Sequence, residues 1–233
     1  MQSKPPVGQT TDNALPTRIA DILIERIITG KLQPGEWIRQ DAVAAEFGAS
    51  HVPVREAFRR IEARGLLVSE PRRGVRVADL DRSSIIEVTR IRAAMEPLAL
   101  RHAIPAITAE DMLKLEAAIA AGDQATGMQE WEAANRTFHE TLYTPCAMRR
   151  VLASIREMHE IRLRYMYATA GHINWDPGSQ HEHQLILQSV RSGDVDRACE
   201  LVHEHVVLAG ELLINALDQV LAKSQSGKVS AAK

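Results

Sequence analysis

Residues 40–65 read QDAVAAEFGASHVPVREAFRRIEARG, and this stretch decides how the first part of the chain folds. Its apolar residues recur every three or four positions in two short runs, at about 40–47 and 51–64, which predicts two helices. Between the runs, Gly48 ends the first helix and Ser50 is a favourable N-cap for the second. Two helices joined by so short a turn cross each other, which is the geometry of a helix-turn-helix.

The flanking residues extend this unit on both sides. An apolar stripe that begins after Pro16 predicts a further helix, and Gly30 ends it. Downstream of Gly65, two short apolar runs around a polar loop predict a β-hairpin, with strands at 66–68 and 75–77. The order helix, helix, turn, helix, β-hairpin is typical of a winged helix-turn-helix. A small α+β bundle without a role in DNA binding is the alternative.

From about residue 81 onward, the sequence predicts one helix after another. Pro and Gly residues separate them, and Thr108-Ala-Glu-Asp111 has the spacing of a capping box at a helix start. Six helices with short connections predict an antiparallel bundle. The predicted spans are 82–103, 108–121, 127–142, 147–170, 179–192 and 194–221.

We therefore expect a mainly α protein, in which an N-terminal winged helix-turn-helix precedes an all-α antiparallel bundle of about six helices. Polar, Pro-containing and Ser/Gly/Lys-rich ends predict disorder at both termini. The predicted parts are a disordered arm at 1–14, the winged helix-turn-helix at 15–79, the helical domain at 80–222 and a disordered tail at 223–233.

Composition and charge are those of a soluble cytoplasmic protein that contacts a polyanion through one end. No uninterrupted apolar run approaches the roughly 20 residues of a membrane span, and residues 1–16 lack a signal core. Cys146 and Cys199 lack metal-type spacing, which fits a reducing compartment. The net charge is −2, but residues 1–78 hold 12 Lys+Arg and 9 Asp+Glu, a balance of +3, which leaves 16 and 21, or −5, for the rest. A basic module on an acidic body favours a DNA partner.

The predicted DNA contacts lie at the start of the second helix of the helix-turn-helix, because that part meets base edges in the major groove. Arginines can pair with phosphates or bidentately with guanine, and a basic wing tip can reach a groove. For Arg59 and Arg64, a solvated helix face is the alternative. Glu56 is expected to position Arg55 or to cap the backbone. The candidates are Ser50, His51, Val52, Arg55 and Arg59, the more distal Arg60 and Arg64, and Arg72, Arg73 and Gly74 of the wing.

Eight of the nine histidines follow residue 100, and three lie on predicted inward faces of separate helices. His139 follows Asn135 by one turn, His183 shares a face with Ile186, Leu187 and Val190, and His205 shares a stripe with Leu201, Leu208 and Leu212. Three converging imidazoles could bind a divalent cation such as Zn²⁺ or Ni²⁺. The alternative for each is a hydrogen-bonded core histidine. His181 and His203 should point away from this centre, and His102, His159 and His172 show no pattern.

The N-terminal stretches Gly30-Lys-Leu-Gln-Pro-Gly35, Ser50-His-Val-Pro-Val-Arg-Glu-Ala57 and Glu62–Leu66 resemble the winged-helix signature of the GntR superfamily, in its FadR-type branch. The resemblance covers residues 17–78. It implies that Arg55 contacts the operator, with Arg39, Ser50 and His51 as further contacts. The family usually has Arg in place of His51 and often Glu in place of Gln40, so the operator sequence cannot be carried over from relatives.

The helical part resembles the FCD ligand-binding domain of the same proteins, through Asn135-(…)-Phe138-His139, Glu182-His183 and Glu204-His205. This resemblance implies a metal held by Asn135, His139, His183 and His205, and a small carboxylate effector bound to that metal. The family commonly has Asp where this chain has Asn135, which lowers the charge of the site by one unit. Arg92 matches a family arginine that suits a carboxylate effector. A salt bridge to Glu96 or to the other domain is the alternative for Arg92.

These observations predict a homodimeric transcriptional regulator, more specifically a repressor, which binds a palindromic DNA operator under the control of a carboxylate effector. Two other classes stay open. A metal-dependent enzyme could use the histidines to activate water, although no residue has motif support as the general base. The second open class is a helical interaction module that binds no ligand.

Overall fold

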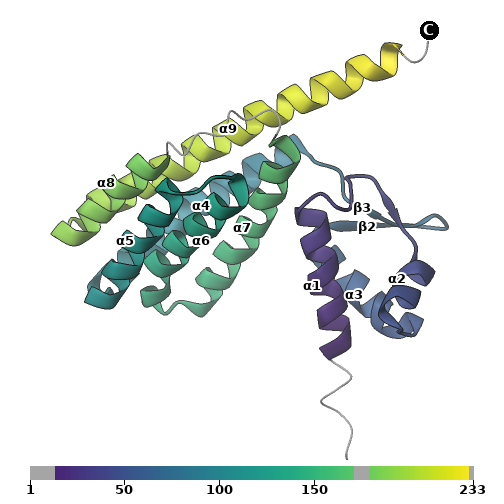
Figure 1. Ribbon diagram of the computed structural model, residues 1–233, viewed down its shortest axis with the longest axis horizontal. Helices are drawn as coiled ribbons and strands as arrows, with labels where there is room; N and C mark the ends of the chain where they lie inside the picture. The colour runs from purple at the N-terminus through teal and green to yellow at the C-terminus, as the bar shows by residue number, and fades with distance from the viewer. Residues whose placement is uncertain (1–13, 171–178, 231–233) are drawn as a thin grey trace, which may run out of the picture. The chain divides into compact units, whose positions relative to one another are not determined.

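A computed structural model describes residues 14–170 and 179–230 of the chain, which form two compact units within Met1–Leu80 and Asp81–Lys233 (Figure 1). The arm predicted at 1–14 lies outside the described residues except for Ala14, which begins the first helix. Helices dominate both units, and the chain has the predicted class, a winged helix-turn-helix followed by a helical domain.

The described residues of the first unit, from Ala14 on, form three helices and a small antiparallel sheet. Its helices are α1 (Ala14–Ile28), α2 (Gln40–Phe47) and α3 (His51–Ala63). The strands β1 (Trp37–Ile38), β2 (Leu67–Glu70) and β3 (Gly74–Val77) pair in the order β1-β3-β2. Strand β1 was not expected, because two residues are too few to show an alternating pattern. It forms because Trp37 pairs with Arg76 and Ile38 with Val75 across the sheet.

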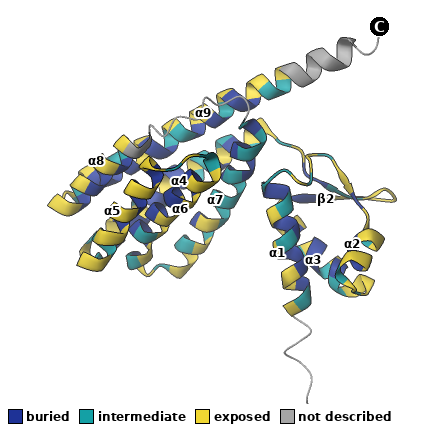
Figure 2. Ribbon diagram, viewed as in Figure 1, coloured by how far each residue is buried: buried dark blue, intermediate teal, exposed yellow. Residues whose placement is uncertain are grey.

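The turn between α2 and α3 depends on one glycine. Gly48 has φ +59°, a left-handed conformation that an L side chain rarely adopts, and its N–H bonds back into α2. Ser50 has the extended backbone of an N-cap, although its side chain makes no capping hydrogen bond. Apolar residues of all three helices form the core of this unit (Figure 2), among them Ile19, Leu23, Ile27, Val54, Phe58 and Ile61.

In the part of the second unit that the structure describes, the expected six helices are present. They are α4 (Arg82–Ala103), α5 (Ala109–Asp123), α6 (Met128–Tyr143), α7 (Arg149–Thr169), α8 (Ser179–Ser192) and α9 (Val195–Ser230), with the short 3₁₀ turns η1 (Ile104–Ala106) and η2 (Thr144–Cys146). The capping box predicted at Thr108 is present, with Asp111 as its reciprocal partner. Helix α4 packs against α6, α7 and α9, so its inward face is the centre of this domain (Figure 1).

Helix α9 differs from expectation in its length and in its inward face. Its backbone stays helical to Ser230, past the start of the predicted tail, because no proline interrupts it. Leu208 and Leu212, expected beside His205, are exposed, and Val202 and Val206 are buried instead. The physical reason is that Val202 and Val206 share a helix face with Gly210, which packs against Thr89 of α4, whereas Leu208 and Leu212 lie off that face.

Among the described residues, Val195–Ala222 of α9 is long and apolar enough to cross a membrane by length and composition, with a mean hydropathy of 1.3. Such a segment is weak evidence of a membrane, because the core helix of a soluble protein passes the same test.

Candidate functional site

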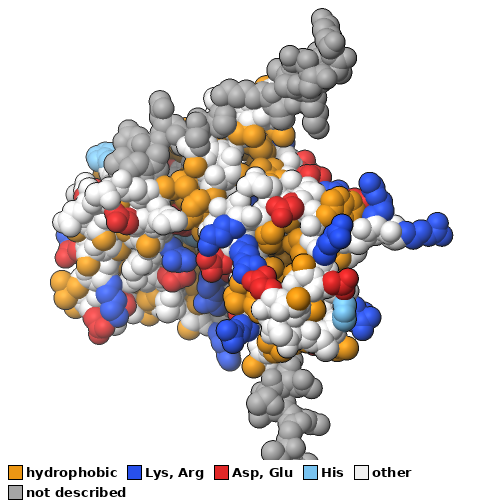
Figure 3. Space-filling view, turned by 45° about the vertical axis from the view of Figure 1, so that its right-hand side comes forward, with side chains coloured by type: hydrophobic (Ala, Val, Ile, Leu, Met, Phe, Trp, Pro, Cys, Tyr) orange, Lys and Arg blue, Asp and Glu red, His pale blue; other side chains and the backbone are white. Residues whose placement is uncertain are grey.

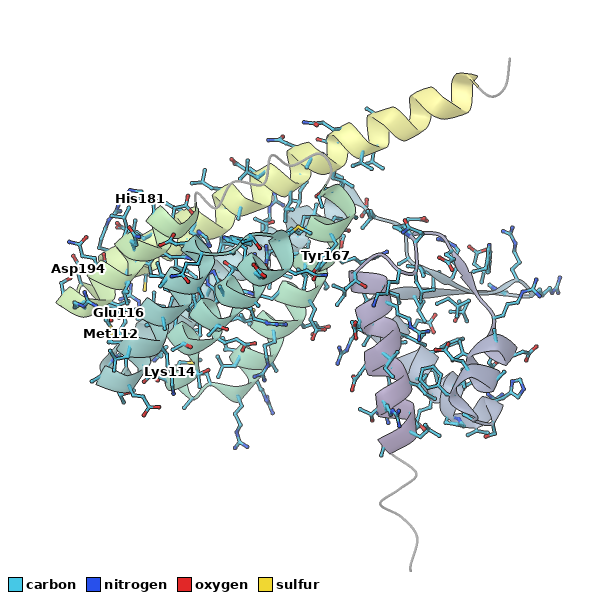
Figure 4. All side chains as sticks on the ribbon, in the orientation of Figure 1. Met112, Lys114, Glu116, Tyr167, His181 and Asp194 are labelled. Carbon is cyan, nitrogen blue, oxygen red and sulfur yellow. The ribbon has the colours of Figure 1, made fainter. Side chains whose placement is uncertain are left out.

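Three histidines from three helices meet inside the second unit. His139 of α6, His183 of α8 and His205 of α9 are all buried, and one nitrogen of each lies within 4.8 Å of the others. Their ring centroids are 4.9–5.2 Å apart in every pairing. The structure thus brings together the three histidines that the sequence placed on inward faces. His181, two residues from His183, is exposed and points away from them (Figure 4), as expected.

Hydrogen-bond partners determine which nitrogen of the His139 and His205 rings faces the cluster. The Tyr143 hydroxyl donates to Glu96 Oε2 at 2.8 Å, so it accepts from His139 Nδ1 at 3.1 Å. The Glu182 carboxylate lies 2.5 Å from His205 Nδ1 and accepts a hydrogen bond from it. In both rings Nε2 then keeps the lone pair. Within the described residues His139 Nε2 is buried and has no hydrogen-bond partner. Partners of this kind orient histidine ligands in metal sites.

The electrostatics of the His139 and His183 rings favour their neutral forms. Burial holds the pKa of His139 well below its ordinary value, more strongly than the nearby Glu96 carboxylate raises it. Burial also lowers the pKa of His183, with a smaller contribution from His205. Neutral imidazoles offer lone pairs, which a divalent metal requires. Three such nitrogens around one point, one of them an orphaned buried acceptor, fit a site for Zn²⁺ or Ni²⁺.

Asn135 is buried on α6 one turn before His139. Its Nδ2 donates to Glu132 Oε2 at 3.4 Å, and the same oxygen accepts from Arg162 Nη2 at 2.6 Å. The amide oxygen remains as the only metal-binding atom that this side chain can offer. Its role as a ligand stays a prediction.

A buried carboxylate, Glu96 of α4, connects the cluster to a second set of polar groups. Glu96 Oε1 accepts from Arg92 Nε at 2.6 Å and lies 2.9 Å from His159 Nε2. Burial alone would raise the pKa of Glu96, but Arg92 and the histidines hold it well below its ordinary value. The salt bridge considered for Arg92 therefore exists, and its role in binding an effector stays a prediction. The sequence missed His159, because its neighbours give no signal that α7 turns it inward.

A cavity of about 200 Å³ lies between α6 and α7 and adjoins the cluster at His139. Tyr143, His159 and Glu132 also line it. Trp131 and Tyr165 are buried, and Tyr165 Oη donates to the Asp81 carbonyl at 2.9 Å.

All of the predicted DNA contacts are exposed on the first unit. They are Arg39, Ser50, His51, Val52, Arg55, Arg59, Arg72, Arg73 and Gly74. Basic side chains stand out at the tip of the wing in Figure 3. Arg73 lies 5.3 Å from the centroid of the Trp37 ring and pairs with Glu70, and His51 Nε2 is 3.6 Å from Asp41 Oδ1.

One expectation on α3 was wrong. Glu56 pairs with Arg60 and not with Arg55, because residues four apart share a helix face whereas adjacent residues diverge. Arg60 also donates to Thr17 Oγ1 at 2.6 Å. It therefore ties α3 to α1 and is a poor candidate for a phosphate contact.

Comparisons with known proteins agree with both units. Residues 15–77 match the sequence profile of bacterial regulatory proteins of the gntR family, and residues 87–208 match the FCD domain. A probable D-xylose utilization operon transcriptional repressor of Paenarthrobacter nicotinovorans is 27% identical over 84% of this chain and 87% of its own length. The HTH-type transcriptional repressor GlaR of Escherichia coli is 24% identical over 78% of this chain and 87% of its own.

Solved structures agree as well. A GntR-family transcriptional regulator of Pseudomonas syringae superposes with a TM-score of 0.54 at 27% identity, and covers 97% of this chain and 92% of its own. A regulator from Rhodococcus reaches a TM-score of 0.73 at 21% identity over 87% of this chain and 99% of its own, a likeness of fold alone.

Proposed function

The chain belongs to the GntR family of bacterial regulators, with an FCD domain after its DNA-binding unit, and on this premise we propose that a small carboxylate effector, bound beside a divalent metal, controls its affinity for an operator. Members of this family and the relatives above are DNA-binding regulators and not enzymes. The enzyme alternative is thereby excluded.

The observation that carries the effector half is the buried cluster of His139, His183 and His205, with ligand nitrogens within 4.8 Å. These residues would hold the metal, with the Asn135 amide oxygen as a fourth ligand. A bound divalent ion supplies positive charge and open coordination positions, which suit a carboxylate. Arg92 would add a guanidinium on the same side of the domain.

In the DNA-binding unit, the α3 start and the wing carry the exposed side chains that a duplex requires. Arg55 and His51 would meet base edges, and Arg72 and Arg73 would meet phosphates. A homodimer would present two such units to a palindromic operator. Two relatives are named as repressors, which favours repression, and the cytoplasm is where such a protein would meet its DNA.

The experiment is thermal unfolding of the full chain, loaded with Zn²⁺ or Ni²⁺ or stripped with a chelator, against a panel of small carboxylic acids. An acid at 100 times its Kd should stabilise the loaded protein by about 2.7 kcal/mol and leave the stripped protein unchanged. The same acid should change the affinity for an operator selected by the protein from random duplexes.

His183→Ala and His181→Ala form a matched pair two residues apart, one in the cluster and one exposed. His183→Ala should lose bound metal, measured by elemental analysis, together with the response to the acid. His181→Ala should keep both. If the wild-type protein neither retains metal nor responds to any acid, the effector half of the proposal fails and the DNA-binding half stands.

A further inference from the structure

His159 of α7 is a polar group of the cavity that is not one of the three clustered histidines. Its ring centroid lies 5.5 Å from that of His139, in an edge-on arrangement, and both residues line the cavity between α6 and α7. Its side chain is 12% exposed, so it is nearly but not wholly enclosed. If one group of a ligand lies near His139 in this cavity, a second group only a few bonds away in the same ligand can reach His159.

The hydrogen bonds around Glu96 assign the proton of the neutral His159 ring. The Glu96 carboxylate receives hydrogen bonds from Arg92 and Tyr143, and an ionised carboxylate can only accept. His159 Nε2, 2.9 Å from Glu96 Oε1, is therefore the protonated nitrogen. The remaining nitrogen, Nδ1, has a lone pair and can only accept. His159 lines the cavity, and Nδ1 is the ring nitrogen that is not engaged with Glu96, so this residue can offer the cavity an acceptor, which favours a ligand that brings a donor.

The rest of the cavity wall sets the other properties of the ligand. Leu152, Ile155 and Leu163 form an apolar surface. Glu132 of the wall pairs with Arg162, and the formal charges of the other four charged lining residues cancel, which are Arg136, Glu140, Arg156 and Glu160. A volume of about 200 Å³ admits only a small molecule.

We propose that His159 is a specificity-determining residue, which accepts a hydrogen bond from the hydroxyl group of a 2-hydroxycarboxylate whose short aliphatic chain lies against Leu152, Ile155 and Leu163. The hydroxyl belongs next to the carboxylate because His139 and His159 are neighbours. This inference rests on the proposed function, which places the carboxylate at the histidine cluster.

The test is titration calorimetry of the zinc-loaded full chain with matched acids that differ by one hydroxyl group. The pairs are lactate and propanoate, 2-hydroxypentanoate and pentanoate, and 2-hydroxy-4-methylpentanoate and 4-methylpentanoate. One neutral hydrogen bond predicts that the hydroxy acid binds about two- to tenfold more tightly. Among the hydroxy acids, each carbon that becomes buried should tighten binding roughly fourfold.

Three variants assign the preference to His159. His159→Phe removes the acceptor, and the two acids of a pair should then bind equally. His159→Gln can still donate to Glu96 and accept from the ligand, and should keep the preference. Arg156→Ala, one turn away on the same cavity wall, should also keep it. Zinc content and the circular dichroism spectrum report whether each variant retains its site and fold.

The possible failures are distinguishable. If the loaded protein binds none of these acids, the carboxylate effector of the proposed function is wrong, and this inference falls with it. If the acids bind but each pair shows a ratio near one in the wild-type protein, only the inference is overturned. A preference that persists in a folded His159→Phe protein overturns it too. The wild-type ratio and the Gln variant decide the matter should the Phe variant not fold.

Discussion

Among single residues, Glu96 has the most demanding environment in the helical domain. Its side chain is fully buried, and groups of three helices satisfy it: Arg92 of its own α4, Tyr143 of α6 and His159 of α7. A buried carboxylate is tolerated only when charge and hydrogen bonds compensate its lost hydration. Burial and the same carboxylate raise the pKa of Tyr143 well above its ordinary value, so its hydroxyl remains a donor.

We expect Glu96→Gln to lower the free energy of unfolding by about 3–5 kcal/mol, because it leaves the buried Arg92 guanidinium without its counter-charge. Urea unfolding of the chelator-stripped protein measures this change. Glu116→Gln, which removes the exposed partner of Arg191, should cost less than about 1 kcal/mol. Equal effects of the two substitutions would contradict this view of Glu96.

Glu182 acts on the proposed metal through His205. Its carboxylate accepts from His205 Nδ1 at 2.5 Å and so aims Nε2 at the cluster. We expect Glu182→Gln to weaken zinc binding by about 10- to 100-fold, measured by competition with a chelating dye. Glu204→Gln, an exposed change next to His205 in sequence, is the control and should leave zinc affinity unchanged. An unaltered affinity in Glu182→Gln would show that His205 needs no such support.

Among the elements, α4 and α9 approach each other closely at Gly210. A Cβ added there would lie 2.3 Å from Thr89 Cγ2 and 2.4 Å from Thr89 Oγ1, which no side chain tolerates without a shift. Gly210 is therefore the residue that lets α9 approach α4, the helix that carries Glu96.

Gly210→Ala should destabilise the protein by about 1–3 kcal/mol through this overlap, although alanine is intrinsically the better helix former by about 1 kcal/mol. Thermal and urea unfolding would check the sign. Adding Thr89→Ala removes the two nearest atoms and should restore part of the loss, as a double-mutant cycle shows. A more stable Gly210→Ala protein would mean that the two helices are free to separate at this point.

The predicted role of the wing is to contact DNA phosphates, which does not depend on the base sequence. Arg72 and Arg73 are exposed at its tip. If each meets one phosphate, replacing both with alanine should reduce the slope of log K against log salt by about 1.8. Fluorescence anisotropy at several salt concentrations measures this slope. Arg55→Ala, in contrast, should mainly reduce discrimination between operator and unrelated DNA, and an unchanged slope in the double variant would exclude the wing from the interface.

For the whole molecule, the proposed function requires that effector binding in the helical domain is energetically coupled to operator binding in the DNA-binding unit. If the effector weakens operator binding tenfold, the operator must weaken effector binding tenfold, because the coupling is reciprocal. Calorimetric titration of the effector into the free protein and into the protein–operator complex tests this equality. Unequal factors would mean that the acid acts on a species outside the assumed cycle, such as a different oligomer.

The sequence by itself determined the parts of this protein that depend on local interactions. The α4 and α8 bounds equal the predicted spans, since helix periodicity and end signals are local. The helix-turn-helix was predictable for the same reason, because Gly48 and Ser50 act within one turn. The inward face of His183 followed from its apolar neighbours Ile186 and Leu187, three and four residues away.

Only the tertiary structure decided which groups meet. His159 and Glu96 are 63 residues apart, and their contact depends on how α4 packs against α7. Strand β1 exists only because β3 pairs with it, and Leu208 is exposed because it lies off the face of α9 that packs against α4 at Gly210. The hydrogen bond between Glu182 and His205 joins two different helices, and no local sequence pattern predicts it. Periodicity reports the direction of a side chain on its own helix, whereas a contact depends on the position of a second helix that long-range packing sets.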